Sequence, residues 1–434
     1  MQGFFFYKAM GILFWICIFI ILCLITVTTY FKPYLGIMFV VVSIPFEGKV
    51  GIDSFHFYPL ELIMIILISV YIFRIIVRKS NDYRNMKLVF YYLPFIMCIL
   101  LSSLKFMEFS STIKEIVRWL ELIVIYYLTI NLITDQKKLR VILYSIFLTT
   151  VMVSIYGVVN YLEGAEAVKG RPGTFSFFGH PNALAGYINL TIPVLFCMLM
   201  ATTFMWERIT LICFTILITI TWFLTFSKSG WLSLVVTVIL LFSSFAKVRR
   251  KYLFILIILF MSFAIIFISS GIKKDFSGRL QFAATYDPLE KRIRSYPIGF
   301  NMVKSDLFFG IGVGNYPLLI KKYADPAAMG HLITTDLHNL YLQVFVEAGL
   351  MGLFAFMFWL TGITRYLIRA MKLLENYSHY DIFVGLMGGV FVYLFNNLAN
   401  VLTVHGIHIQ WGIILGLAVV LTQFRESETC PKAV

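Results

Sequence analysis

Residues 340–364 read LYLQVFVEAGLMGLFAFMFWLTGIT and directly follow the polar sequence TTDLHN at residues 334–339. A helix of this length crosses the ~30 Å hydrocarbon core of a bilayer. The polar residues before it end the only long water-soluble segment of the chain, which extends from Ile272 to His338. The boundary at His338 therefore places a polar loop directly against a membrane span.

Apolar runs of this kind recur along the whole chain. Hydrophobic residues make up 60% of the 434 residues and charged residues only 13%, whereas soluble domains have roughly 45–50% and about 25%. We expect the first run, Met10 to Thr29, to be retained, because it is too long for a signal-peptide core and lacks a small-residue cleavage site. The sequence predicts an all-α polytopic membrane protein with candidate spans at residues 10–30, 34–47, 59–77, 88–105, 116–134, 140–161, 181–203, 209–226, 230–246, 252–271, 340–364, 381–403 and 408–424.

Lysine and arginine crowd four short loops, which indicates that these loops are cytoplasmic. The clusters are Arg78, Lys79, Arg84 and Lys87; Lys137, Lys138 and Arg140; Lys247, Arg249, Arg250 and Lys251; and Arg365, Arg369 and Lys372. The loops at 162–180, 227–229, 272–339 and 404–408 are then extracytoplasmic. A cytoplasmic N-terminus requires an even total, so we expect about twelve spans. The short run at 34–47 is then re-entrant or half crossing, and the parity stays open.

This order divides the chain into five segments. Transmembrane helices occupy residues 1–161 and 162–271, the second group with its outer loop at 162–180. A large extracytoplasmic loop at 272–339, further transmembrane helices at 340–424 and a cytoplasmic tail at 425–434 follow. The net charge of +14 is typical of basic cytoplasmic loops and contact with anionic membrane lipids, and we expect no nucleic-acid partner. Five of the six cysteines lie in apolar runs and Cys430 in the tail, so we expect neither a disulfide framework nor a metal site.

The loop at 272–339 is itself rich in cations. Positive charge outside works against the positive-inside tendency, from which long loops are exempt. We therefore expect this charge to bind a phosphate-bearing ligand. Residues 290–307 are expected to form an interfacial helix broken near Pro297, and the glycine run 310–316 is a turn signal rather than a dinucleotide fingerprint. The basic residues are Lys273, Lys274, Arg279, Lys291, Arg292, Arg294, Lys304, Lys321 and Lys322.

His338 is the main candidate for a catalytic base. We expect a threonine or the aspartate at 334–336 to cap the following helix, with His338 in or near its first turn. The helix dipole disfavours imidazolium there, so His338 is expected to be neutral near pH 7 and able to accept a proton. Glu347 lies about half a rotation away on the helix and is not expected to orient the histidine.

Other polar residues stand at or inside the spans. His180, at the start of the helix that Pro181 opens, is a second candidate base. Arg171, in the outer loop before that helix, can bind phosphate oxygens as a planar fork. Lys228, the only charge in the turn 225–230, either anchors a lipid headgroup or neutralises a diphosphate. Ionisable and amide groups inside spans are functional or packing candidates: Glu121, Glu347, Asn396, Asn397 and Asn400.

These pieces, in this order, resemble the O-antigen ligase and polymerase family of bacterial envelope enzymes. The resemblance covers roughly residues 150–360, and residues 1–150 match only in being membrane spans. It rests on Arg171 with Gly173-Thr174-Phe175, Asn182-Ala183-Leu184-Ala185, Phe226-Ser227-Lys228-Ser229-Gly230, Arg294 ahead of Asn301-Met302-Val303-Lys304-Ser305-Asp306, Gly310-Ile311-Gly312-Val313-Gly314-Asn315-Tyr316, His338-Asn339-Leu340-Tyr341-Leu342-Gln343 and Glu347-Ala348-Gly349-Leu350-Met351-Gly352.

The resemblance implies a twelve-span fold of the C-type glycosyltransferase kind in the bacterial cytoplasmic membrane, with its site facing outward. It implies transfer of a glycan from undecaprenyl diphosphate to an acceptor hydroxyl, without metal or cofactor. Arg171 and Arg294 would bind the diphosphate, assisted by Arg279 or Arg292, and His338 would be the general base. The sequence departs from the family where Lys228 replaces a usual arginine and where His180 replaces a usually uncharged residue. Supporting roles fall to Asn182, Asn339 and Glu347.

Several functional alternatives stay open. The acceptor is either another lipid-linked repeat, as for a polymerase, or a different lipid anchor, as for a ligase, and polysaccharide-assembly proteins are candidate partners. Attack opposite the diphosphate would invert the anomeric configuration. A lipid-linked glycan flippase or other transporter is the rival of another class, although transporters usually place ionisable residues at mid-membrane and have short loops. A peptidoglycan polymerase of the shape-and-division type would instead require a catalytic carboxylate such as Asp287 or Asp336.

Overall fold

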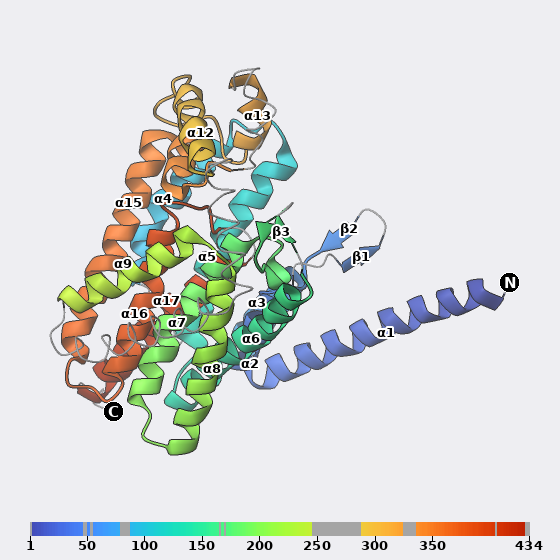
Figure 1. Cartoon of the computed structure of the whole chain (residues 1–434), viewed down its shortest axis with the longest axis vertical. Coiled ribbons are helices and arrows are strands. Elements are labelled where there is room, and N and C mark those ends of the chain that lie inside the picture. Colours follow the sequence, from blue (N-terminus) through green and yellow to red (C-terminus); the bar gives the residue numbers. More distant parts are fainter. Residues whose placement is uncertain are drawn as a thin grey trace.

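The computed structural model describes residues 2–46, 50–52, 55–78, 87–164, 166–168, 171–244, 288–323, 336–403 and 406–429. Within these ranges the chain is mostly helical (Figure 1). The helices are α1 Gln2–Phe31, α2 Pro33–Ser43, α3 Pro59–Arg78, α4 Lys87–Ser103, α5 Phe109–Leu132, α6 Gln136–Leu162, α7 Pro181–Ala201, α8 Met205–Leu224, α9 Lys228–Ser244, α12 Pro288–Val303, α13 Tyr316–Tyr323, α15 Leu340–Leu374, α16 Tyr380–Asn396 and α17 Ile407–Thr429, with a short 3-10 helix at Ser176–Phe178. Two antiparallel hairpins pair β1 Val50–Ile52 with β2 Phe55–Phe57, and β3 Glu166–Val168 with β4 Arg171–Pro172.

Six of the described helices have the length and apolar composition of membrane spans. They begin at Pro59, Gln136, Pro181, Met205, Leu340 and Ile407. Shorter apolar helices lie at Ile16–Phe31, Pro33–Ser43, Leu88–Ser103, Lys228–Leu241 and Tyr380–Asn396. The prediction of a polytopic helical membrane protein is confirmed, whereas the total of twelve spans stays a prediction. The expected span at 252–271 and the loop residues 272–287 lie outside the described residues.

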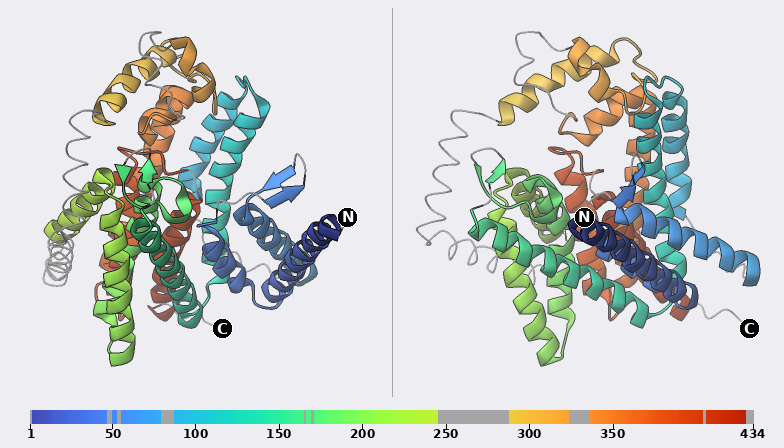
Figure 2. Two further views of the ribbon diagram at one scale, coloured as in Figure 1. Left: turned by 45° about the vertical axis from the view of Figure 1, so that its right-hand side comes forward. Right: turned by 90° about the vertical axis from the view of Figure 1, so that its right-hand side faces the viewer.

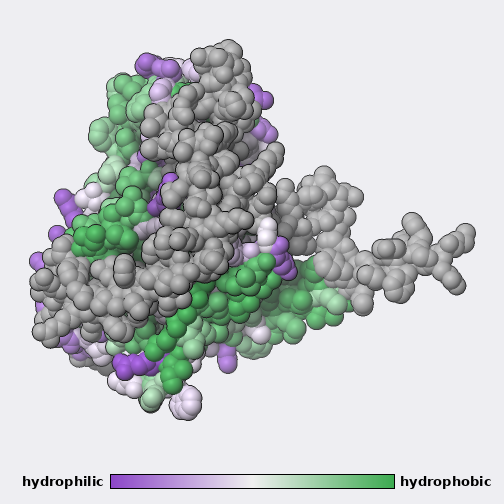
Figure 3. All heavy atoms as spheres, viewed as in Figure 1, coloured by the Kyte–Doolittle hydropathy of each residue, from purple (hydrophilic) through white to green (hydrophobic). Residues whose placement is uncertain are grey.

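Helices α7 and α17 form the centre of the bundle. Both spans are 94% buried, because α7 packs against α8, α9, α16 and α17, while α17 also packs against α5. The span in α3 is only 22% buried and presents apolar side chains outward, as expected for a helix facing lipid. Figure 3 shows broad hydrophobic areas on the described part of the visible surface, and Figure 2 shows α1 leading away from the bundle toward the N-terminus.

Several helix boundaries differ from the sequence-based expectation. Helix α5 begins at Phe109, before the expected residue 116, because its polar first turns line a cavity rather than face lipid. Helix α15 continues to Leu374, so the basic cluster at 365–372 is helical and not a loop. Lysine and arginine are good helix formers and are favoured near the C-terminal end of a helix dipole. Helix α12 continues through Pro297 instead of breaking there.

Helix α16 ends at Asn396, whereas the sequence indicated a span to residue 403. The asparagine cluster therefore forms the end of the helix and the following turn. Asn397 Oδ1 accepts the Leu402 backbone N–H at 2.8 Å, and the backbone oxygens of Asn397 and Asn400 both accept from Leu340 N. The side-chain amides thus shape the turn after α16, and the backbone oxygens of this turn hold the start of α15.

Helix α15 is interrupted at Gly349, which has φ +69° and ψ −168°. The freed backbone groups bind residues 307–312, which include the start of the glycine run 310–316. The N–H groups of Ile311 and Gly312 donate to the oxygens of Val346 and Glu347 at 3.0 and 3.1 Å. In return, the N–H groups at 350 and 351 donate to the oxygens at 307 and 308 at 2.9 and 3.2 Å. The expected turn is confirmed, and it also completes the hydrogen bonding of a broken membrane helix.

A second, smaller hydrophobic core lies over the N-terminal end of α15. Its buried side chains come from α12, α13, the glycine run and α15, and Figures 1 and 2 show α12 and α13 at this end of the bundle. Leu337 is completely buried in it, directly before His338. This core therefore fixes the backbone next to the candidate base. Its buried members are Ile298, Met302, Ile311, Tyr316, Ile320, Leu337 and Val346.

We predict that Gly349→Ala strongly destabilises the protein. The added Cβ would overlap the backbone oxygen of Phe308, and Gly310→Ala would overlap the backbone of Glu347 in the same way. The matched control is Gly164→Ala, since Gly164 has φ +73° and nothing within 4 Å of the added Cβ. The control should cost only the left-handed strain of about 1–2 kcal/mol. Thermal unfolding in detergent measures both variants, and equal losses of Tm would contradict the backbone docking.

Candidate functional site

His338 and Asp336 form a compact pair before the start of α15. The Asp336 carboxylate accepts the His338 backbone N–H at 2.7 Å, and its Oδ1 lies 3.0 Å from His338 Nδ1. His338 has φ +50°, a left-handed conformation that the aspartate turn supports. Asn339, not a residue at 334–336, is the N-cap, and its Oδ1 accepts from Leu342 N at 3.0 Å. His338 therefore directly precedes the N-cap, near the first turn of α15 as expected. Residues 334 and 335 lie outside the described ranges.

Gln343 connects this turn to the interior of α15. Its Oε1 accepts the Leu337 backbone N–H at 3.0 Å, and its Nε2 donates to Glu347 Oε1 at 2.9 Å. Glu347 is buried, and its backbone oxygen accepts from Ser102 Oγ at 2.6 Å. As the sequence indicated, Glu347 does not contact His338 directly. It acts through Gln343, which holds the backbone of Leu337, the residue directly before His338.

Segments far apart in the sequence meet at this end of the bundle, which we call the His338 end: residues 173–182, 225–229, 336–340 and 397–403. Asn182 Oδ1 accepts from Ser227 Oγ at 2.8 Å, and Asn400 Nδ2 donates to Ser229 Oγ at 3.0 Å. The Thr174 N–H donates to the backbone oxygen at residue 224 at 3.0 Å. These contacts bring the described outer-loop candidates to one end; which side of the membrane that end faces stays a prediction.

His180 belongs to the same end. It is the N-cap of α7, where Pro181 begins the helix as expected, and its Nδ1 accepts from Asn182 N at 3.1 Å. Burial by itself would raise the pKa of Asp336. Hydrogen bonds from the His338 imidazole and backbone, with the charges of His338 and His180, lower that pKa below its ordinary value. The two candidate histidines therefore act on one carboxylate.

Of the five cations predicted to bind the diphosphate, the structure describes the side chain of Lys228 alone. Arg171 lies in β4, where its backbone pairs with Val168, and Lys228 is the exposed first residue of α9 beside the His338 end. Arg292 and Arg294 lie in α12, but their side chains and that of Arg171 are outside what the structure describes, as is all of Arg279. Their binding of a diphosphate accordingly stays a prediction.

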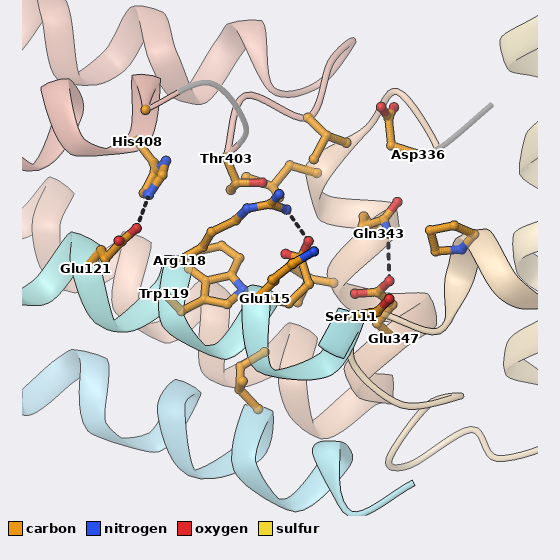
Figure 4. Close-up of a pocket in the computed structure, with 18 of the residues that line it drawn as sticks. Ser111, Glu115, Arg118, Trp119, Glu121, Asp336, Gln343, Glu347, Thr403 and His408 are labelled. Carbon is orange, nitrogen blue, oxygen red and sulfur yellow. Dashed lines mark hydrogen bonds and ion pairs between the residues drawn. The ribbon is translucent and has the colours of Figure 1, made fainter. Parts of the chain in front are cut away.

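A cavity of about 540 Å³ opens beside the aspartate–histidine turn. Asp336, Gln343 and Glu347 line one part of it, and α5 contributes Ser111, Lys114, Glu115, Arg118, Trp119 and Glu121 (Figure 4). Arg118 forms an ion pair with Glu115, and His408 Nε2 at the start of α17 lies 3.5 Å from Glu121 Oε2. Within the described ranges, no three histidine, cysteine or carboxylate side chains are grouped as a metal site requires.

Sequence reasoning missed several of these residues. From the sequence, Asp336 is a candidate helix cap or the carboxylate of a rival mechanism, although its spacing of two residues before His338 is that of an aspartate turn. His408 stands where the loop 404–408 meets the last apolar run, and Glu121 stands inside another apolar run. One acid and one base in separate spans are a signal for pairing, because single buried charges are costly. Only the fold shows that these two side chains are the ones that meet.

We predict a defined acid dependence for the contribution of Asp336 to stability. Because the folded-state pKa is lowered from 3.8, the carboxylate stabilises the fold above that pH, and the stabilisation is lost as pH falls through the lower folded value. The difference in Tm between the wild type and Asp336→Asn should shrink as the pH falls from about 5 through the lowered folded pKa of Asp336. Glu163→Gln, which removes an exposed charge at the end of α6, is the control. A difference that grows as the pH falls below about 5 would contradict a lowered pKa of the Asp336 carboxyl group.

Comparison of the sequence with known proteins finds a match to one protein family. No curated protein matches the chain in a sequence search. Residues 213–357, about a third of the chain, match the model of a protein family described as O-antigen ligase. The matched segment begins within α8 and includes α9, the basic loop, the glycine run, His338 and the break at Gly349. The match confirms the predicted resemblance: residues 213–357 are similar to the O-antigen ligase family.

Proposed function

We propose that this protein is a glycosyltransferase that moves a glycan from undecaprenyl diphosphate to an acceptor hydroxyl at the outer face of the bacterial cytoplasmic membrane. The observation that carries the proposal is the Asp336–His338 pair, held at the end of a membrane helix inside the matched O-antigen ligase domain. The contact to Asp336 holds the imidazole by Nδ1. Nε2 is then the nitrogen that accepts the proton of the acceptor hydroxyl.

The proposed reaction is one displacement at the anomeric carbon. The acceptor oxygen forms a bond to that carbon, the bond from carbon to the diphosphate oxygen breaks, and His338 takes the hydroxyl proton. Negative charge develops on the leaving diphosphate, and preorganised cations stabilise it. In the proposal Arg171 and Arg294 supply that charge, assisted by Arg279 or Arg292 and by Lys228. Attack opposite the leaving group inverts the anomeric configuration, and these cations make a metal ion unnecessary.

The proposal includes the orientation of the molecule. The basic cluster at 365–372 lies near the C-terminal end of α15, whereas His338 lies just before its start. The positive-inside tendency assigns this cluster and the cluster at 137–140 to the cytoplasm. The His338 end would then face outward, within a twelve-span fold of the C-type glycosyltransferase kind. Among the two acceptors, a second lipid-linked repeat is our preference, which makes the protein a polysaccharide polymerase rather than a ligase.

We predict that His338→Ala abolishes glycan extension without lowering the protein level, because the base is lost while Asn339 still caps α15. The measurement compares lipid-linked and surface polysaccharide in cells carrying the wild type, His338→Ala or no protein. His379→Ala is the matched histidine control, because His379 lies in the turn between α15 and α16, at the other end of α15 from His338. Single repeats accumulating on the outer leaflet of both defective strains would support a polymerase.

Other outcomes of the same experiment separate the alternatives. Full-length chains accumulating on the lipid would indicate a ligase. Repeats retained on the cytoplasmic leaflet of the null strain, with His338→Ala behaving as wild type, would indicate a transporter and overturn the enzyme proposal. Normal chain lengths in His338→Ala cells would remove His338 from the mechanism.

We predict that Arg294→Ala lowers kcat with the lipid diphosphate donor by roughly 10²-fold, since losing one preorganised donor to a developing anion typically costs 10²–10³. The control is Lys321→Ala, which removes one exposed cation from α13 in the same loop. Initial rates in proteoliposomes, at varied donor concentration, measure the effect. Unchanged kcat and KM would reject the assignment of Arg294, and equal losses in both variants would indicate only a general effect of loop charge.

A further inference from the structure

The cavity beside Asp336 has the size and composition of a binding site for a polar ligand. Its volume of about 540 Å³ falls within the ~300–1,000 Å³ typical of ligand pockets. Phe46 and Tyr58, both partly exposed, lie at its lining together with buried Trp119. Aromatic walls with a few convergent polar groups are the usual lining of such pockets.

The charge of the lining is negative. Five carboxylates face two cationic side chains, and one of these cations, Arg118, is already paired with Glu115. A diphosphate would meet net repulsion here, whereas hydroxyl groups would find many acceptors. The carboxylates are Glu61, Glu115, Glu121, Asp336 and Glu347, and the cations are Lys114 and Arg118.

His408 provides an independent observation. Its side chain is only 5% exposed, and neither ring nitrogen makes a hydrogen bond to the part of the chain that the structure describes. Figure 4 shows its ring directed at Glu121, 3.5 Å away, across the cavity lining. A buried polar group without a hydrogen bond costs free energy, which a bound ligand recovers. His408 and Glu121 therefore mark the inner end of the cavity as a place for a hydrogen-bonding ligand.

We propose that this cavity is the saccharide subsite for the acceptor glycan. The inference rests on the proposed function and adds to it the place where the acceptor binds. Sugar hydroxyls would donate to Glu121 and would accept from or donate to His408. The reacting hydroxyl would lie at the part of the cavity lined by Asp336, next to His338. The anionic cavity keeps out the donor diphosphate, which stays with the cations of the basic loop.

The test measures saccharide binding without catalysis. The probe is the phosphate-free oligosaccharide repeat, released by mild acid from the lipid-linked material of the same cells. Isothermal titration with the full-length protein in nanodiscs of neutral lipid should show saturable binding. We expect Glu121→Gln and His408→Gln each to weaken this binding about 10-fold or more. Each variant removes the charged or imidazole group that would hydrogen-bond a sugar hydroxyl in the buried part of the cavity. Glu163→Gln, outside the cavity, should bind as wild type.

A second variant keeps the test decisive if the buried substitutions prevent folding. Ser111→Tyr adds bulk at a partly exposed position of the lining and should block the probe while leaving Tm unchanged. His338→Ala should still bind the oligosaccharide although it extends no glycan, so failure of the subsite and failure of the proposed function are distinguishable. Absence of binding to the wild type, or equal binding by all cavity variants, would overturn the subsite. Loss of farnesyl diphosphate binding in Glu121→Gln, with saccharide binding intact, would also overturn it by assigning the cavity to the donor.

Discussion

The backbone pairing between the glycine run and the break in α15 is the contact on which the site depends. Four hydrogen bonds join residues 307–312 to the groups that Gly349 leaves free in a membrane helix. Water does not satisfy such groups in a bilayer, so protein must do so. Close approach of the two backbones leaves no space for a Cβ at Gly310 or Gly349. The large loop is thereby held directly against the membrane domain.

This attachment determines where the polar groups of the site can lie. Glu347, whose backbone takes part in the pairing, holds Gln343, and Gln343 holds the Leu337 backbone beside His338. On one side of the Asp336–His338 turn lies the carboxylate-lined cavity. The proposed function places the cations that bind the diphosphate in the basic loop and at the His338 end. Separate regions of opposite charge would let one site distinguish a neutral hydroxyl acceptor from an anionic donor.

Hydrogen bonds between side chains join the segments of the His338 end. Asn182, Ser227, Ser229 and Asn400 join three of these segments, and such networks favour one arrangement. His408 differs, because its ring lacks a hydrogen bond within the described chain. The His408 ring is therefore free to bind a ligand in the cavity, whereas the side chains of the network are engaged with one another.

Apolar periodicity and length by themselves determined the membrane class, the approximate spans, and the boundary at His338, because each depends on local sequence against a ~30 Å bilayer. Local spacing also marked the glycine turn. The tertiary structure alone decided that α5 starts at Phe109 to line a cavity, that the asparagines end α16, and that Glu121 meets His408. It also decided that Asp336 orients His338. These features depend on contacts between segments distant in sequence, and on a backbone with φ +50° at His338 that no periodicity encodes.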